Sequence, residues 1–118
     1  MKYMLLIYHD ENGLSPGERE RCYEESAQLA QKLSAGGQYL DAAPLHPTST
    51  ATSVRVREGK PLITDGPFAE TREQLGGYYL IDAKNLDEAI GIATKIPGGK
   101  WGTVEIRPVM EIQGLPTN

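Results

Sequence analysis

The amino-acid sequence predicts an α+β fold in which two helices cover one face of an antiparallel β-sheet. Runs typical of strands are interleaved with two segments of helical periodicity, in the order strand, helix, strand, hairpin, strand, helix, strand. This order is the split β-α-β pattern of a ferredoxin-like sheet, here with an inserted β-hairpin. The chain of 118 residues is expected to form a single domain over residues 1–112, followed by a loose tail over residues 113–118.

Four strands of the sheet are predicted from short apolar or alternating runs. The first, Tyr3 to Tyr8, is continuously apolar and stops at the turn-rich segment His9–Gly13. The others are expected over residues 39–43, 78–81 and 103–109.

The two helices are predicted from their start and stop residues. Ser15, Pro16 and Glu18 form a capping box with proline at the first helical position, and Gly36 and Gly37 end this helix. A second helix is expected to start at residue 85, with a cap residue and a glutamate three positions on, and to break at residues 97–99. The expected inner faces are Cys22, Ser26, Leu29, Ala30 and Leu33 in the first helix, and Leu86, Ala89, Ile90, Ala93 and Ile96 in the second.

A β-hairpin is predicted over residues 53–64. The segment Val54–Arg57 alternates with period two, and Glu58–Lys60 turns the chain into a second apolar run. Pro61 has no N–H for a strand ladder, so it is placed at the start of the returning strand or on a sheet edge.

Two of the expected strands, Tyr3–Tyr8 and Tyr78–Ile81, are apolar on both faces. Two helices can cover only one face of the sheet, and the chain has no further helix to cover the other. Soluble proteins rarely expose such a patch, so the sequence predicts a homodimer that packs sheet against sheet.

Composition excludes several function classes. A net charge of −4 with scattered basic residues argues against direct binding of nucleic acid. Cys22 is the single cysteine, which precludes an internal disulfide and zinc-type spacing, and no metal or cofactor is predicted. The apolar run at the N-terminus is too short for a membrane-spanning helix and lacks the features of a signal peptide. A reducing, cytoplasmic location is therefore expected, without membrane association.

The stretch TDGPFAETREQLGG, residues 64–77, with Tyr78–Ile81 after it, resembles the signature of the DGPF group of YCII-related proteins. Residues 1–8, 86–89 and 104–109 match that group as well. The resemblance implies a dimeric α+β barrel built from ferredoxin-like subunits, and it implies no settled biochemical function. The sequence accordingly does not decide whether the protein is an enzyme.

Two functional leads come with this resemblance. Some shorter YCII proteins carry a histidine on the first helix and a nearby aspartate as a proposed catalytic pair, but residues 16–35 contain no histidine here. DGPF proteins are also associated by genomic neighbourhood with extracytoplasmic-function sigma factors, which implies a regulatory partner.

The acidic residues of the motif are the main candidates for chemistry. Asp65 and Glu70 would face a cleft between subunits, where burial or mutual repulsion raises a carboxyl pKa. The alternative is structural, because Asp65 followed by Gly66 and Pro67 also suits a turn. His9 ends the first strand and is a third catalytic candidate at the mouth of a pocket. The expected ligand-binding residues are Tyr8, Asp65, Phe68, Glu70, Arg72, Glu73 and Tyr78.

Three functions remain open from the sequence. The first is binding or transformation of a small molecule in a cleft near the motif. The second is a non-enzymatic regulator acting with a sigma factor. In the third, the motif has a purely structural role at the dimer interface.

Overall fold

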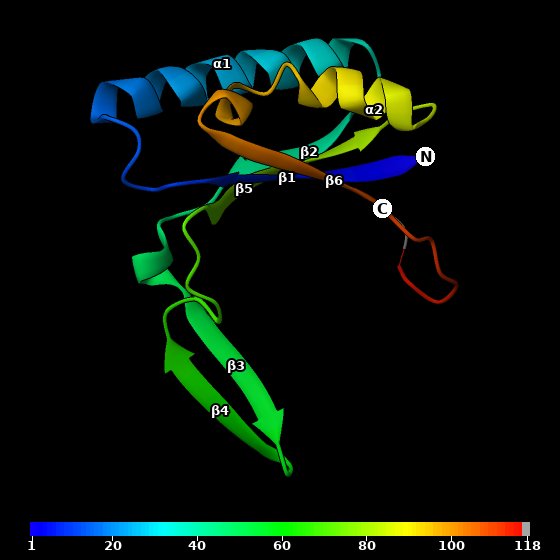
Figure 1. The fold of residues 1–118 in the computed structure, drawn as a ribbon. Coiled ribbons are helices and arrows are strands. Elements are labelled where there is room, and N and C mark those ends of the chain that lie inside the picture. Colours follow the sequence, from blue (N-terminus) through cyan, green and yellow to red (C-terminus); the bar gives the residue numbers. More distant parts are fainter. Residues whose placement is uncertain (117–118) are drawn as a thin grey trace.

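The structure is a computed structural model and describes residues 1–116. Helices lie on one side of a four-stranded sheet, and a β-hairpin projects from the other side (Figure 1). In chain order the elements are β1 (Lys2–His9), α1 (Pro16–Ala35), β2 (Tyr39–Pro44), the 3-10 turn η1 (Thr48–Thr50), β3 (Thr52–Arg57), β4 (Lys60–Asp65), β5 (Gln74–Asp82), α2 (Leu86–Ala93), the 3-10 turn η2 (Pro97–Lys100) and β6 (Gly102–Pro108).

The sheet has the strand order β2-β5-β1-β6, and all neighbouring strands are antiparallel. Leu5 in the central strand β1 lies opposite Tyr79 of β5 and Ile106 of β6. This is the ferredoxin-like arrangement with an inserted hairpin, so the fold predicted for the chain is confirmed.

Helix α1 begins with the predicted capping box. The Ser15 hydroxyl accepts a hydrogen bond from the Glu18 backbone N–H at 3.2 Å, and the Glu18 carboxylate accepts one from the Ser15 N–H at 3.0 Å. These contacts satisfy donors that a helix N-terminus otherwise leaves unpaired. At the other end Gly37 has φ +78°, a left-handed conformation that glycine adopts cheaply.

The core lies between the helices and the sheet. Leu5 and Ile81 are completely buried there, under Leu29 and Leu33 of α1. The inner face predicted for α2 is wrong at two positions, since Leu86 and Ile90 are exposed. The buried row of α2 consists instead of Ala89, Ile92, Ala93 and, beyond the helix end, Ile96. These residues recur at three- and four-residue spacing, which turns residue 90 toward solvent.

Strand β5 begins four residues earlier than predicted and includes Gly76 and Gly77. A Cβ at Gly77 would lie 3.0 Å from the carbonyl oxygen of Ala43 in β2. These glycines therefore permit a close backbone approach inside the sheet, as expected for glycine within a strand.

The hairpin β3–β4 forms as predicted. Its two-residue turn has positive φ at Glu58 (52°) and Gly59 (73°), which matches the twist of antiparallel strands. Pro61 lies in β4 opposite Val56, and within residues 1–116 β4 pairs only with β3. Pro61 is thus on an edge strand, where its missing N–H costs no ladder bond.

The predicted tail, residues 113–118, ends outside the described part of the chain at residues 117–118, while Gly114 has φ +94° in a turn. Among the helices of residues 1–116, none has the length and apolar character needed to cross a membrane.

Candidate functional site

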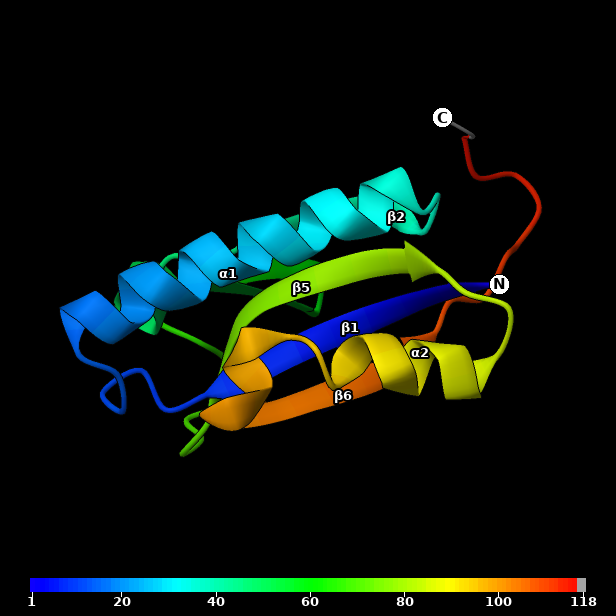
Figure 2. The same cartoon turned by 90° about the horizontal axis from the view of Figure 1, so that it is seen from above.

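A cavity of about 310 Å³ opens at the His9 end of the sheet, between the first half of α1 and strands β1, β2 and β5. Its position follows from the length of α2. Eight helical residues extend about 12 Å, whereas the eight residues of β1 extend about 26 Å. Helix α2 therefore covers only the Met1 end of the strand, and the short turn η2 covers the other end (Figure 2).

Glycines keep this end of the sheet thin. A Cβ at Gly98 would lie 2.7 Å from Cγ2 of Ile7. A Cβ at Gly76 would overlap the His9 imidazole at Nε2. Gly102 leaves room for the carbonyl oxygen of Tyr8, which would otherwise collide with a side chain. The positions of these missing side chains are taken by Ile7, the His9 ring and the Tyr8 carbonyl oxygen, and Gly76 and Gly98 also line the cavity.

His9 is the histidine that lines this cavity. It ends β1 opposite Gln74, and its ring lies against Gly76, which also lines the cavity. Nδ1 is 3.3 Å from the carbonyl oxygen of Asp10. The ring atom that lies against Gly76 is Nε2, so the imidazole is held between strand β5 and the Asp10 carbonyl oxygen.

One face of α1 forms the opposite wall. Arg19, Cys22, Tyr23 and Ser26 recur at three- and four-residue spacing and line the cavity. The guanidinium of Arg19 donates from Nη2 to the carbonyl oxygen of Glu11 at 2.8 Å, which ties the helix to the loop after β1. Burial raises the pKa of the Cys22 thiol, so Cys22 contributes an apolar thiol rather than a thiolate.

Four aromatic residues also line the cavity, namely Tyr23, Tyr39, Tyr79 and Trp101. The Tyr79 hydroxyl donates to the carbonyl oxygen of Ser26 at 2.6 Å, and burial raises its pKa. The described residues that line the cavity include Arg19 and His9 but no carboxylate, although the chain as a whole carries a net charge of −4. The cavity thus combines an apolar, aromatic wall with basic groups.

The structure brings only part of the predicted site together. His9 lines the cavity. Tyr78 borders it as well, but it lies with Leu80 on the face of β5 away from the helices, and its hydroxyl donates to Asp41 Oδ2 at 2.8 Å. The Tyr8 hydroxyl instead donates to Glu105 at 3.2 Å, and Glu73 accepts from Thr103 at 2.8 Å.

Four predicted residues, Asp65, Phe68, Glu70 and Arg72, are exposed in the single chain and do not line the cavity. At the start of this segment Gly66 has φ +103°, and its N–H donates to the carbonyl oxygen of Ala51 at 2.7 Å. These observations support the alternative that Asp65 and Gly66 belong to a turn. A ligand role for the four side chains stays a prediction.

Sequence reasoning missed the α1 wall and Trp101. Cys22 and Ser26 were assigned to the core, because the spacing of a helix face does not distinguish a packed core from a cavity wall. The sequence feature that could have indicated the cavity is the set of small residues around it, Ala42, Ala43, Gly76, Gly77 and Gly98. In the described part of the chain, no group of three His, Cys, Asp or Glu side chains could hold a metal ion.

Comparisons with known proteins agree with this architecture. The family model of the YCII-related domain matches residues 1–113. An uncharacterised protein, R00369, of Rhizobium meliloti (strain 1021) is 38% identical in an alignment of 114 residues, and the match covers 92% of each chain. A solved structure of 5-chloro-2-hydroxyhydroquinone dehydrochlorinase (TftG) from Burkholderia phenoliruptrix AC1100, in complex with 2,5-dihydroxybenzoquinone, superposes with a TM-score of 0.54 at 13% identity. That superposition covers 96% of this chain and 97% of the other, and it indicates a shared fold.

Proposed function

Because the chain belongs to the YCII-related family, whose fold it has, we propose that it is a homodimeric protein that binds a small molecule in the His9 cavity. The observation that supports this most directly is the cavity itself. Its volume of about 310 Å³ falls at the lower end of the range for small-molecule sites, and its aromatic wall with few polar groups is typical of them.

The ligand class follows from the charges of the wall. Arg19 and His9 favour a neutral or anionic ligand, and the lack of a lining carboxylate among the described residues disfavours a cation. Tyr39, Tyr79 and Trp101 favour a flat ring that stacks on or packs against them. A small aromatic compound with an acidic or hydroxyl group meets both requirements. The compound bound to the structural neighbour, 2,5-dihydroxybenzoquinone, is a quinone rather than an aromatic compound, but it has the same combination of a flat ring and hydroxyl groups.

His9 is the group through which this site would act on such a ligand. An imidazole accepts a proton from the hydroxyl group of a bound ring compound, and the resulting anion is stabilised by the imidazolium. This assignment gives His9 the acid–base role and leaves Asp65 and Glu70 outside the cavity.

Ligand binding is testable with a matched set of probes and variants. Benzoate, phenol and benzylamine are titrated by NMR chemical-shift perturbation into the wild type, Ala27→Phe and Gln31→Phe. Both positions are exposed on α1, but only Ala27 lines the cavity. Benzoate or phenol should perturb cavity residues, and Ala27→Phe should weaken that binding at least about tenfold while Gln31→Phe retains it. Equal binding by Ala27→Phe and the wild type, or no binding of any probe, would contradict the proposal.

The homodimer is supported by the sheet face away from the helices. Met4 and Leu6 alternate with the buried residues of β1 and lie opposite Leu80 and Tyr78 of β5. No described helix covers this apolar row (Figure 1). Sedimentation equilibrium should therefore give twice the chain mass of 12.9 kDa at micromolar concentration, and the monomer mass alone would refute the dimer. We do not propose the sigma-factor alternative, because it rests on the resemblance alone.

A further inference from the structure

The hairpin β3–β4, residues 52–65, is here called the arm. We propose that the arm is an assembly element: its apolar face packs against a second copy of this chain. The proposal rests on the homodimer proposed above and adds the surface that holds it together.

The arm has one apolar and one polar face. Val54 lies opposite Ile63, and Val56 lies opposite Pro61, so these four side chains share a face. On the other face Arg55 lies opposite Leu62. In the single chain the apolar face is open to solvent, with Val54 and Val56 each 62% exposed and Ile63 69% exposed.

A two-stranded hairpin of this kind is marginally stable by itself in water. All six residues of β4 are exposed, and the arm forms a separate sheet rather than joining β2-β5-β1-β6. The apolar face therefore needs a cover that the described part of the same chain does not provide.

The base of the arm is fixed to the domain, which gives the arm a defined direction. The Glu11 carboxylate accepts hydrogen bonds from the Thr48 backbone N–H at 2.7 Å and the Thr48 hydroxyl at 2.9 Å. The Ser53 hydroxyl donates to the carbonyl oxygen of Gly66 at 2.8 Å across the two ends of the arm. Such preorganisation lowers the entropic cost of docking.

Direction and charge both point to a second copy as the occupant. The arm projects from the side of the sheet that the helices leave open, which is also the side of the proposed sheet-to-sheet contact (Figure 1). Two sheets facing each other place each arm alongside the other subunit. The arm carries three basic and two acidic side chains, whereas the whole chain has a net charge of −4, so the arm and the rest of another copy have net charges of opposite sign.

Neighbouring residues with opposite orientations provide the test. Ile63→Ser changes the apolar face, and Leu62→Ser, its matched control, changes the polar face at the next position of the same strand. Dimer dissociation constants are measured by sedimentation equilibrium, with far-UV circular dichroism to verify folding. Each dimer contains the substitution twice, so Ile63→Ser should raise the dissociation constant at least about 100-fold and Leu62→Ser less than about fivefold.

The possible results separate this proposal from the one on which it rests. A dimeric wild type whose dissociation constant responds equally to Ile63→Ser and Leu62→Ser would overturn the arm contact and leave the homodimer standing. A monomeric wild type would overturn both. Should Ile63→Ser fail to fold, Val54→Ser against Arg55→Ser gives the same comparison on the opposite strand.

Discussion

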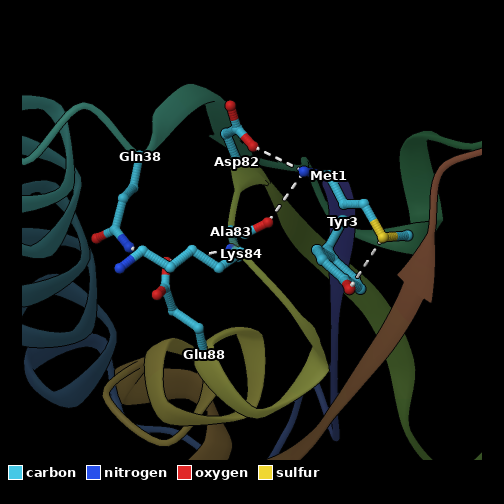
Figure 3. Close-up of polar contacts among 7 residues, drawn as sticks. All are labelled: Met1, Tyr3, Gln38, Asp82, Ala83, Lys84 and Glu88. Atoms are coloured by element: carbon cyan, nitrogen blue, oxygen red, sulfur yellow. Dashed lines mark hydrogen bonds and ion pairs between the residues drawn. The ribbon is translucent and has the colours of Figure 1, made fainter.

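The two ends of the sheet are built in opposite ways. At the Met1 end, side chains and termini of neighbouring elements are joined by hydrogen bonds (Figure 3). The amino group of Met1 donates to Asp82 Oδ1 at 3.1 Å and to the carbonyl oxygen of Ala83 at 3.0 Å, and Gln38 donates to Glu88 at 2.7 Å. At the His9 end, glycines replace side chains, and a cavity occupies the space.

This difference shows how a domain of this size accommodates a cavity beside a packed core. Helix α2 and the largest buried side chains, Leu5, Ile81 and Ile96, provide the apolar core. The cavity lies beyond the end of α2, at the margin of that core, and Tyr79 belongs to both the core and the cavity wall. Binding sites commonly reduce stability locally, and the two-ended arrangement confines this cost to one end.

The largest effect on stability is expected from adding a side chain to a glycine at the His9 end of the sheet. In Gly102→Ala the new Cβ would overlap the carbonyl oxygen of Tyr8, a backbone atom that cannot move without breaking the β1–β6 pairing. We expect the free energy of unfolding to fall by about 3 kcal/mol or more in urea denaturation. Gly91→Ala is the control, since a Cβ there meets nothing within 4 Å, and in helix α2 it should raise stability by about 0.5–1 kcal/mol. Similar stabilities for the two variants would show that the thin end is not closely packed.

An intermediate effect is expected from the cavity wall. Tyr79→Phe removes the hydrogen bond to the Ser26 carbonyl oxygen and should cost about 1 kcal/mol at neutral pH. Burial raises the pKa of Tyr79 above its ordinary 10.0, so the folded protein holds this proton more tightly than the unfolded chain. The contribution of the protonated Tyr79 hydroxyl to the free energy of unfolding is complete below pH 10. It is lost as pH rises through the pKa of the folded protein. Urea denaturation between about pH 9 and 11 should therefore show a smaller loss of stability in Tyr79→Phe than in the wild type. An equal loss of stability in the wild type and in Tyr79→Phe over this pH range would contradict the raised pKa of Tyr79.

The smallest effect is expected at the Met1 end. The ion pair between the Met1 amino group and Asp82 joins side chains that are 60% and 56% exposed, and solvent screens such pairs. Asp82→Asn should change the free energy of unfolding by less than about 0.5 kcal/mol in thermal denaturation at low salt. A loss well above 1 kcal/mol would mean that the Met1 end depends on this charge pair more than on packing.

Local chemistry made most of the fold predictable from the sequence. Ser15 and Glu18 identified the start of α1, because a capping box involves only residues within one turn. Glu58 and Gly59 identified the hairpin turn for the same reason. Ile90 was misplaced because a two-turn helix offers too few apolar positions to determine its rotation, which tertiary packing sets.

The candidate site was less predictable because it depends on side chains that are absent at glycine positions. Gly76, Gly98 and Gly102 create space through neighbours that are distant in sequence, and no local pattern reveals those neighbours. The motif residues attract attention through their unusual composition, yet Phe68 is 82% exposed in the single chain. A sequence does not show that such a side chain lies outside the cavity, because exposure depends on the packing of the whole fold.

Trp101 gives the cavity a built-in optical reporter. It is the only tryptophan of the protein, and it lines the cavity while remaining 45% exposed. Indole emission responds to changes in polarity and to nearby aromatic quenchers, so a ring that enters the cavity alters a signal that comes from one known position. Occupancy can therefore be followed in the unlabelled, unmodified chain, and large compound collections can be screened by intrinsic fluorescence alone.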